Sequence, residues 1–258
     1  MSYEDIQLEL HEDIATITID RPDNGNMLRA QTTRELADAL RTVRDDPQIG
    51  AAILTGAGER FFCIGGEHDE LQHLNASAAL PVVDVYELLD TVPKPIVAAV
   101  NGFAVGGGQV LQMMCDLAVA AESALFRQVG PMVGSFDAGY GTWYLEETIG
   151  RRRAKEMWYL NRKYSSREAL EMGLVNEVVP DVDVRDRARE VARELLQRGP
   201  GAIAGLKASF SARHHGVLGQ ARLAHDQLLT RYLASDEAHE LSDAFRSRRA
   251  PDPGRFGH

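Results

Sequence analysis

The sequence predicts an α/β fold in which short strands alternate with helices, with a helical region at the C-terminal end. Two observations predict it. Apolar segments of strand length recur between stretches of helical pattern, and the pattern after Pro180 is helical almost throughout. The loops between the strands and helices are too short for long crossovers. We therefore expect a coil of strand–strand–helix units, although no sequence repeat of fixed period marks them.

Four segments have the pattern of strands. Residues 14–19 alternate apolar and polar side chains, which is typical of a half-buried strand. Short apolar runs typical of buried strands occupy residues 51–54, 96–100 and 117–120. A helix is expected around 83–89, between the second and third of these strands.

A further helix is expected after the first strand, because Thr32 and Glu35 stand at capping-box spacing before a run with an apolar face. The remaining helices are expected over 202–212, 217–234 and 236–248. We place a boundary after residue 198. Residues 1–198 would form the core with the functional site, and residues 199–258 a helical region that packs on the body or on another subunit.

Composition narrows the class of protein. The net charge of −10 argues against nucleic acid as a partner, because phosphate binding needs a basic face. No apolar run is long enough to cross a membrane, and the first residues lack the basic-then-apolar pattern of a signal peptide, so we expect a cytoplasmic protein without a membrane partner. The two cysteines, Cys63 and Cys115, form neither a disulfide framework nor a metal-ligand spacing.

Two glycine-rich turns, over 61–67 and 101–108, carry the first chemical signal. Each follows a strand and can expose a backbone N–H at the start of a helix, where the helix dipole also favours negative charge. Two such donors that converge form an oxyanion hole. The alternative is that these glycines only make tight turns. Neither turn has the GxGxxG spacing of a dinucleotide site.

The segment 93–102, followed by Gly106-Gly107-Gly108 and Cys115-Asp116-Leu117, resembles the enoyl-CoA hydratase/isomerase family of the crotonase superfamily. The resemblance extends over nearly the whole chain. It implies a crotonase-like spiral of β-β-α units with a C-terminal helical trimerisation region, and hence a homotrimer or a dimer of trimers. It also implies that the N–H groups of Gly66 and Gly107 hold the thioester oxygen of an acyl-CoA.

Two further segments narrow the branch. Residues 128–141 and 154–160 are similar to 1,4-dihydroxy-2-naphthoyl-CoA synthase and to 2-ketocyclohexanecarboxyl-CoA hydrolase. The first of these closes a ring by a Dieckmann-type condensation, and the second opens one by hydrolysis. The resemblance therefore implies chemistry at a carbon–carbon bond next to an acyl-CoA thioester.

The acid–base residues of the hydratases are replaced. Val110 and Gly130 stand where hydratases carry two glutamates. In the synthase a glycine at the Gly130 position leaves room for a bicarbonate that acts as base, and residues matching Gln128 and Trp158 hold that ion. Either bicarbonate or water is expected in this space, and no covalent cofactor and no metal.

Asp137 matches the acidic residue that moves protons in the synthase, although an aspartate in Ser-Phe-Asp-Ala-Gly is otherwise typical of a turn. The catalytic tyrosine of the synthase corresponds to Leu233, so Tyr232 replaces it only if the helix register differs. His68 follows the first glycine-rich turn and is either a new acid or base or a surface histidine.

Coenzyme A needs cations for its phosphates. Arg29 matches the family position near the nucleotide, and Phe245 and Arg248 resemble the aromatic and basic residues that a neighbouring subunit lends to the adenine and the 3′-phosphate. Lys207 is a weaker candidate. Two other functions remain open: a hydratase or isomerase that uses His68 or Glu67, and a non-catalytic subunit that only binds acyl-CoA.

Overall fold

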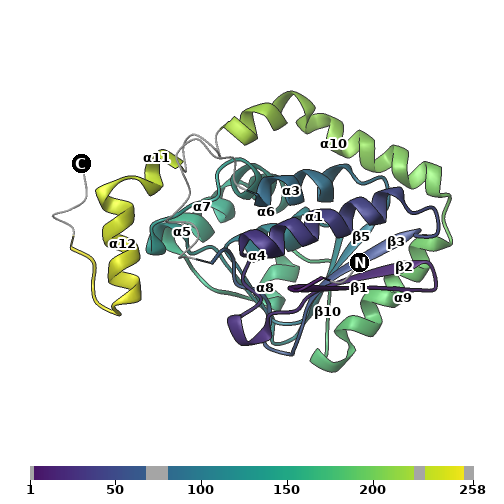
Figure 1. Cartoon of the computed structure of the whole chain (residues 1–258), viewed down its shortest axis with the longest axis horizontal. Coiled ribbons are helices and arrows are strands. Elements are labelled where there is room, and N and C mark those ends of the chain that lie inside the picture. The colour runs from purple at the N-terminus through teal and green to yellow at the C-terminus, as the bar shows by residue number, and fades with distance from the viewer. Residues whose placement is uncertain (1–2, 68–80, 224–229, 253–258) are drawn as a thin grey trace.

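The computed structural model describes residues 3–67, 81–223 and 230–252. Its larger sheet has the strand order β1-β2-β3-β5-β7-β10, and all pairs except β1–β2 are parallel (Figure 1). Its strands are β1 (Ile6–His11), β2 (Ile14–Ile19), β3 (Ala51–Gly56), β5 (Ile96–Val100), β7 (Leu117–Ala121) and β10 (Glu177–Val179). The four strands expected from the sequence are therefore confirmed, and each lies in this sheet.

A second, smaller sheet has the order β4-β6-β8-β9. Its strands are β4 (Phe61–Cys63), β6 (Phe103–Val105), β8 (Leu125–Arg127) and β9 (Tyr164–Ser165). Each of β3, β5 and β7 is followed directly by a strand of this smaller sheet. The expected strand–strand–helix coil is confirmed, and both glycine-rich turns leave the same edge of the smaller sheet because β4 and β6 are parallel neighbours.

Helices cover the sheets. Figure 1 shows α1 (Ala30–Asp45) and α3 (Val82–Thr91) above the larger sheet and α9 (Val184–Leu196) below it. The shorter helices of the coil are α4 (Gly107–Met114), α5 (Gly130–Val133), α6 (Leu145–Ile149), α7 (Arg151–Leu160) and α8 (Ser166–Glu171). Single turns lie at η1 (Pro22–Asn24), η2 (Tyr140–Tyr144) and η3 (Asp181–Asp183). None of the helices in the described part of the chain is long and apolar enough to cross a membrane.

The C-terminal helices differ from the expectation. One helix, α10, runs over Pro200–Leu223, where two helices divided between residues 212 and 217 were expected. It is followed by the short α11 (Thr230–Leu233) and by α12 (Asp236–Arg246), which packs beside α5 at the left of Figure 1. The buried Lys207 anchors α10 to the body, because its Nζ donates to Asp116 Oδ2 at 2.7 Å. This ion pair assigns Lys207 to structure, so the weaker coenzyme A candidate is withdrawn.

Helix α1 begins earlier than the capping-box spacing predicted. Its first residue is Ala30, and the Thr32 hydroxyl accepts the main-chain N–H of Arg29 at 3.3 Å. Glu35 instead accepts the N–H groups of Glu4 and Asp5 at 2.9 and 2.8 Å. The expected cap was wrong because the Glu35 carboxylate is used to fasten the start of the chain to the helix.

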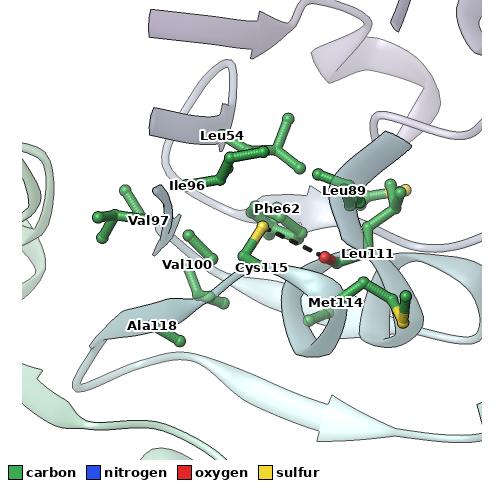
Figure 2. Packing of buried hydrophobic residues seen from close by; sticks show 14 of the residues in the cluster. Leu54, Phe62, Leu89, Ile96, Val97, Val100, Leu111, Met114, Cys115 and Ala118 are labelled. Atoms are coloured by element: carbon green, nitrogen blue, oxygen red, sulfur yellow. Dashed lines mark hydrogen bonds between the residues drawn. The ribbon is translucent and has the colours of Figure 1, made fainter. Parts of the chain in front are cut away.

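The core fills the space between the two sheets and the helices of the coil. Figure 2 shows Phe62 of β4 among Leu54 of β3, Leu89 of α3 and Leu111 of α4, and all four side chains are buried. The Cys115 thiol donates to the Leu111 carbonyl at 3.4 Å, and burial raises its pKa, so this cysteine is part of the packing. Packing of this kind holds β4 and α4, and hence both glycine-rich turns, in a rigid frame.

Candidate active site

A pocket of about 330 Å³ opens where the two glycine-rich turns meet. Its wall includes Gly66 of the first turn and Gly107 of the second, as well as parts of α1, α3 and α5. Most of the wall is apolar. Both glycine-rich turns therefore contribute to the wall of one pocket.

The two turns approach each other through their backbones. A Cβ on Gly65, whose φ is +97°, would lie 3.2 Å from the amide nitrogen of Gly107. A Cβ on Gly108 would lie 1.9 Å from the carbonyl oxygen of Cys63. Side chains at either position would force the turns apart, so glycine is required here by close approach.

The N–H groups of Gly66 and Gly107 have no acceptor among the described residues. Leu28 forms hydrogen bonds with the residues on either side of Gly66. Its N–H donates to the Gly65 carbonyl, and its carbonyl accepts the Glu67 N–H, each at 2.8 Å. The N–H of Gly66 therefore points to the side opposite Leu28. Gly107 is the first residue of α4, where an amide has no partner within the helix. Two unpaired donors in one pocket wall can stabilise a negatively charged oxygen.

Buried asparagines fix the turns that carry these donors. The Asn101 amide donates to the carbonyls of Gly58 and Phe61 at 3.0 and 3.2 Å, and its oxygen accepts the Gly56 N–H at 3.1 Å. Asn26 likewise donates to Phe61 O at 2.8 Å. The end of β5 is thus tied to the link between β3 and β4, which keeps the two turns in register.

The carboxylate of Asp137 also lies in the pocket wall. Its Oδ2 accepts the Tyr86 hydroxyl at 2.9 Å, and its Oδ1 accepts the Gly141 N–H at 3.2 Å. Burial, followed by the charge of Asp137, raises the pKa of Tyr86 far above its usual range, so this hydroxyl keeps its proton. Asp137 has both the position and the protein donors of a group that can take and return a proton.

Gln128 is fully buried, and neither its side-chain oxygen nor its nitrogen has a hydrogen-bond partner among the described residues. The residue lies in the pocket wall beside Gly130 and Trp158. An unpaired buried amide is costly unless a ligand or water satisfies it. The amide offers one acceptor and two donors, which suits bicarbonate or water.

The other two residues expected around this ion have different surroundings. The Trp158 indole N–H donates to Gly141 O at 2.9 Å, so within the chain this donor is already used. A Cβ on Gly130 would lie 2.4 Å from the carbonyl oxygen of Ser135. The space at Gly130 is therefore filled by backbone, and the expectation that its missing side chain leaves room for the ion is corrected.

Tyr232 does not line this pocket. Its ring packs on Phe136, which does, with the ring centroids 5.2 Å apart, and its hydroxyl donates to Glu237 at 3.2 Å. Within one chain the proton-bearing tyrosine nearest to Asp137 is Tyr86. The sequence offered no motif for Tyr86, and its only signal was a tyrosine on the apolar face of an expected helix.

The residues expected to bind coenzyme A lie in two places. Arg29 lies in the pocket wall, but its guanidinium donates to Asp5 at 2.6 and 2.7 Å and to Glu4 at 2.7 Å. Phe245 at the end of α12 lines the pocket of its own chain, where the resemblance placed it on a neighbouring subunit. Arg248 lies beyond α12 and outside the pocket wall, and its main-chain N–H donates to the Phe245 carbonyl at 3.2 Å. Their role with coenzyme A stays a prediction.

One side of the first turn is charged. The Glu67 carboxylate lies in the pocket wall and forms an ion pair with Arg21 at 3.4 Å, and Arg21 also donates to Met27 O at 2.6 Å. Arg21 thus connects the segment at Met27 to Glu67, the residue after Gly66, and no motif in the sequence indicated this contact. His68, the other candidate acid or base, lies outside the described residues.

A coil of β-β-α units with two unpaired amides in one pocket wall fits a class of protein that stabilises a negatively charged oxygen. The chain matches the Enoyl-CoA hydratase/isomerase family over residues 9–254. The chain therefore belongs to the enoyl-CoA hydratase/isomerase family, within the crotonase superfamily, and is an acyl-CoA enzyme of that superfamily.

Solved structures agree in fold over the whole chain. An enoyl-CoA hydratase/isomerase from Pseudoalteromonas atlantica T6c has a TM-score of 0.89 at 27% identity, with 98% of this chain and 100% of that chain covered. An enoyl-CoA hydratase from Mycobacterium avium subsp. paratuberculosis K-10 has a TM-score of 0.88 at 27% sequence identity, with 100% of both chains covered. A carnitinyl-CoA hydratase from Mycobacterium avium has a TM-score of 0.85 at 31% sequence identity, with 97% of this chain and 98% of that chain covered.

Proposed function

We propose that the protein makes or breaks a carbon–carbon bond next to the thioester of an acyl-CoA, by way of an enolate. Gln128 carries the proposal, because its fully buried side-chain amide lies in the same pocket as the N–H groups of Gly66 and Gly107, and none of these groups has a partner in the described part of the chain. The hydratase glutamates are absent. Val110, at one of their positions, is buried in the core, and backbone fills the space beside Gly130 at the other.

The chemistry follows from the pocket residues. The amides of Gly66 and Gly107 donate to the thioester oxygen and stabilise its negative charge, at about 3–4 kcal/mol for each donor. In ring closure, Asp137 takes the proton from the carbon next to the thioester, so the C–H electron pair moves into the enolate. The enolate carbon attacks a second carbonyl, and the proton on Asp137 passes to the oxygen of that carbonyl. In ring opening, Asp137 takes a proton from the water that adds to a ring ketone, the C–C bond breaks towards the thioester, and Asp137 returns this proton to the enolate carbon.

Gln128 is the residue that would hold a bicarbonate ion or a water beside this pocket. Bound at Gln128, bicarbonate would supply a second carboxylate-like base in this pocket, in addition to Asp137. The amide then has a partner for its oxygen and for its nitrogen. This occupancy removes the cost of burying Gln128 unpaired.

The test compares three probes. The protein is incubated with 2-ketocyclohexanecarboxyl-CoA, with the open-chain aryl precursor of 1,4-dihydroxy-2-naphthoyl-CoA, and with crotonyl-CoA, and products are identified by mass spectrometry. We expect ring opening or ring closure, and no hydration of crotonyl-CoA. Hydration as the main activity would establish the rival hydratase, whereas binding without turnover of any probe would establish the acyl-CoA-binding subunit.

Bicarbonate is tested with the active probe. Rates in degassed, bicarbonate-free buffer should fall and recover when bicarbonate is added, with chloride or nitrate as competitors. Gln128→Met should abolish the dependence. Gln112→Met is the matched control, because Gln112 is also a buried glutamine with an unpaired oxygen but lies outside the pocket wall. Rates indifferent to bicarbonate would assign water to the site and favour ring opening.

We also propose that the protein acts in the cytoplasm as a homotrimer or a dimer of trimers. Leu206 and Phe210 stand one turn apart on α10 and are 60% and 72% exposed. Apolar side chains at this spacing are typical of a covered helix face. Light scattering should give three or six times the mass of one chain, and a monomer would contradict the assembly.

A further inference from the structure

Tyr86 and Asp137 come from distant parts of the chain, 51 residues apart, and meet in the pocket wall. The Tyr86 hydroxyl donates to Asp137 Oδ2 at 2.9 Å, and the Gly141 N–H donates to Oδ1 at 3.2 Å. Both carboxylate oxygens therefore have a protein donor. Donors of this kind stabilise the charged form of a carboxylate and restrict its orientation.

The same hydroxyl stands beside the oxyanion donors. It lies 3.4 Å from the position that a Cβ on Gly107 would take. A thioester oxygen held by the Gly107 amide would bring the neighbouring carbon close to both Tyr86 and Asp137. The pair thus lies where a proton must leave that carbon.

Tyr86 is held rigidly in this place. It is 1% exposed on the inner face of α3, and its ring packs against that of Tyr140 with centroids 5.4 Å apart. The Tyr140 hydroxyl is turned to Glu87, to which it donates at 3.1 Å. The Tyr86 hydroxyl, held by this packing, donates to the Asp137 carboxylate.

From these contacts we propose that Tyr86 is the positioning residue of the proton-transfer step, which keeps Asp137 ionised and aimed at the reacting carbon. The inference rests on the proposed function, because it assigns to Asp137 the removal of the proton. Tyr86, and not Tyr232, is the tyrosine of this site within the chain. Tyr232 donates to Glu237 instead.

The experiment measures the removal of a proton directly, without knowledge of the natural acyl group. Phenylacetyl-CoA in D₂O is incubated with the protein, and deuterium at the carbon next to the thioester is followed by NMR between pH 5 and 9. Asp137 accepts the proton as the C–H electron pair moves into the enolate, and a deuteron returns after exchange with solvent. Affinity for the probe is measured in parallel by calorimetry.

Tyr86→Phe should slow exchange about 10- to 100-fold with affinity within twofold, since the oriented donor is lost but the ring remains. It should also move the acidic limb of the pH–rate profile to higher pH, because a carboxylate that loses a donor is protonated more readily. The other titratable groups of the surroundings are unchanged in this variant: Cys63, whose charge acts on Tyr86, Glu67 with Arg21, Tyr140 with Glu87, and Tyr144 with Asp90.

Tyr3→Phe is the matched control. Tyr3 donates to Asp38 of α1 at the same 2.9 Å, but neither residue lies in the pocket wall, so exchange should not change.

Two results would overturn the role of Tyr86 and leave the proposed function standing. In the first, Tyr86→Phe exchanges the proton at the wild-type rate. In the second, exchange is slower but the acidic limb of the pH–rate profile does not move, which is the result expected of a merely structural role. A Tyr86→Phe variant that does not fold is replaced by fluorotyrosine at position 86, which must move the same limb. Failure of the wild-type protein to exchange a probe that it binds would overturn the proposed function itself.

Discussion

The amide nitrogen of Gly107 lies 3.2 Å from the place that a β-carbon on Gly65 would occupy. This approach brings the two glycine-rich turns together so closely that the unpaired amides of Gly66 and Gly107 line one pocket. A close backbone contact of this kind is fixed before any ligand binds, and preorganised donors are the most effective ones. The glycines are thus part of the chemistry as well as of the turn.

Gly107→Pro should lower kcat by at least about 10²–10³ while the protein stays folded, because proline removes one oxyanion donor and suits the first position of a helix. Gly107→Ala is the control. It keeps the N–H, and its Cβ would meet Tyr86 Oη at an ordinary 3.4 Å. Steady-state kinetics and circular dichroism check both variants. If kcat of folded Gly107→Pro lies within a few-fold of wild type, the Gly107 amide is not an oxyanion donor.

Asp137→Asn should be inactive and still bind acyl-CoA. The amide has the size of the carboxylate and can keep bonds to Tyr86 and Gly141, but it cannot accept and return a proton at neutral pH. Calorimetric titration with phenylacetyl-CoA and the turnover assay separate binding from catalysis. An unchanged kcat would assign Asp137 to the turn alone and leave the acid–base role to another group.

Gly130→Ala should destabilise the protein by about 1–3 kcal/mol, because the new methyl group is forced against backbone. Its Cβ would lie 2.4 Å from Ser135 O and 2.9 Å from the Cα of Phe136. Gly201→Ala provides the contrast, since a Cβ there meets nothing within 4 Å on an exposed turn of α10, and should stabilise by about 0.5–1 kcal/mol. The free energies of unfolding of both variants are measured by urea denaturation and compared with that of the wild type. Equal stabilities would contradict the crowding at Gly130.

Asp5→Asn should destabilise the protein at neutral pH and progressively less in acid. Burial alone would raise the pKa of Asp5, but hydrogen bonds from Arg29 and Thr32 outweigh it and hold the pKa below the ordinary 3.8. A depressed pKa means that the carboxylate stabilises the folded state above about pH 4 and that this contribution is lost as pH falls through the lower folded value.

The expected difference from wild type at pH 7 is about 1.5–3 kcal/mol, as for hydrogen bonds to a charged group, measured by guanidinium unfolding from pH 2.5 to 7. Asp45→Asn is the matched control, because Asp45 pairs with Arg44 at 2.7 Å but is 64% exposed, and such surface pairs contribute little. A difference that does not depend on pH would contradict the role of charge at Asp5.

Much of the fold followed from local pattern. The strand β2 was recognised by its apolar–polar alternation, and β3, β5 and β7 by short apolar runs of strand length, which are properties of the local sequence. The boundaries of helices were less certain. The Glu35 carboxylate was expected in a cap, yet it binds the amides of Glu4 and Asp5, which are about 30 residues away.

The sequence by itself determined the two glycine-rich turns, since glycine spacing after a strand is a local property, and the family resemblance placed Val110 and Gly130 at the positions of the hydratase glutamates. Only the tertiary structure decided which side chains share the pocket. Tyr86 meets Asp137, Gln128 stands unpaired, Lys207 turns to Asp116, and the end of α12 brings Phe245 to the pocket of its own chain. Each of these depends on how helices pack across the coil, and packing joins residues that no spacing along the chain relates.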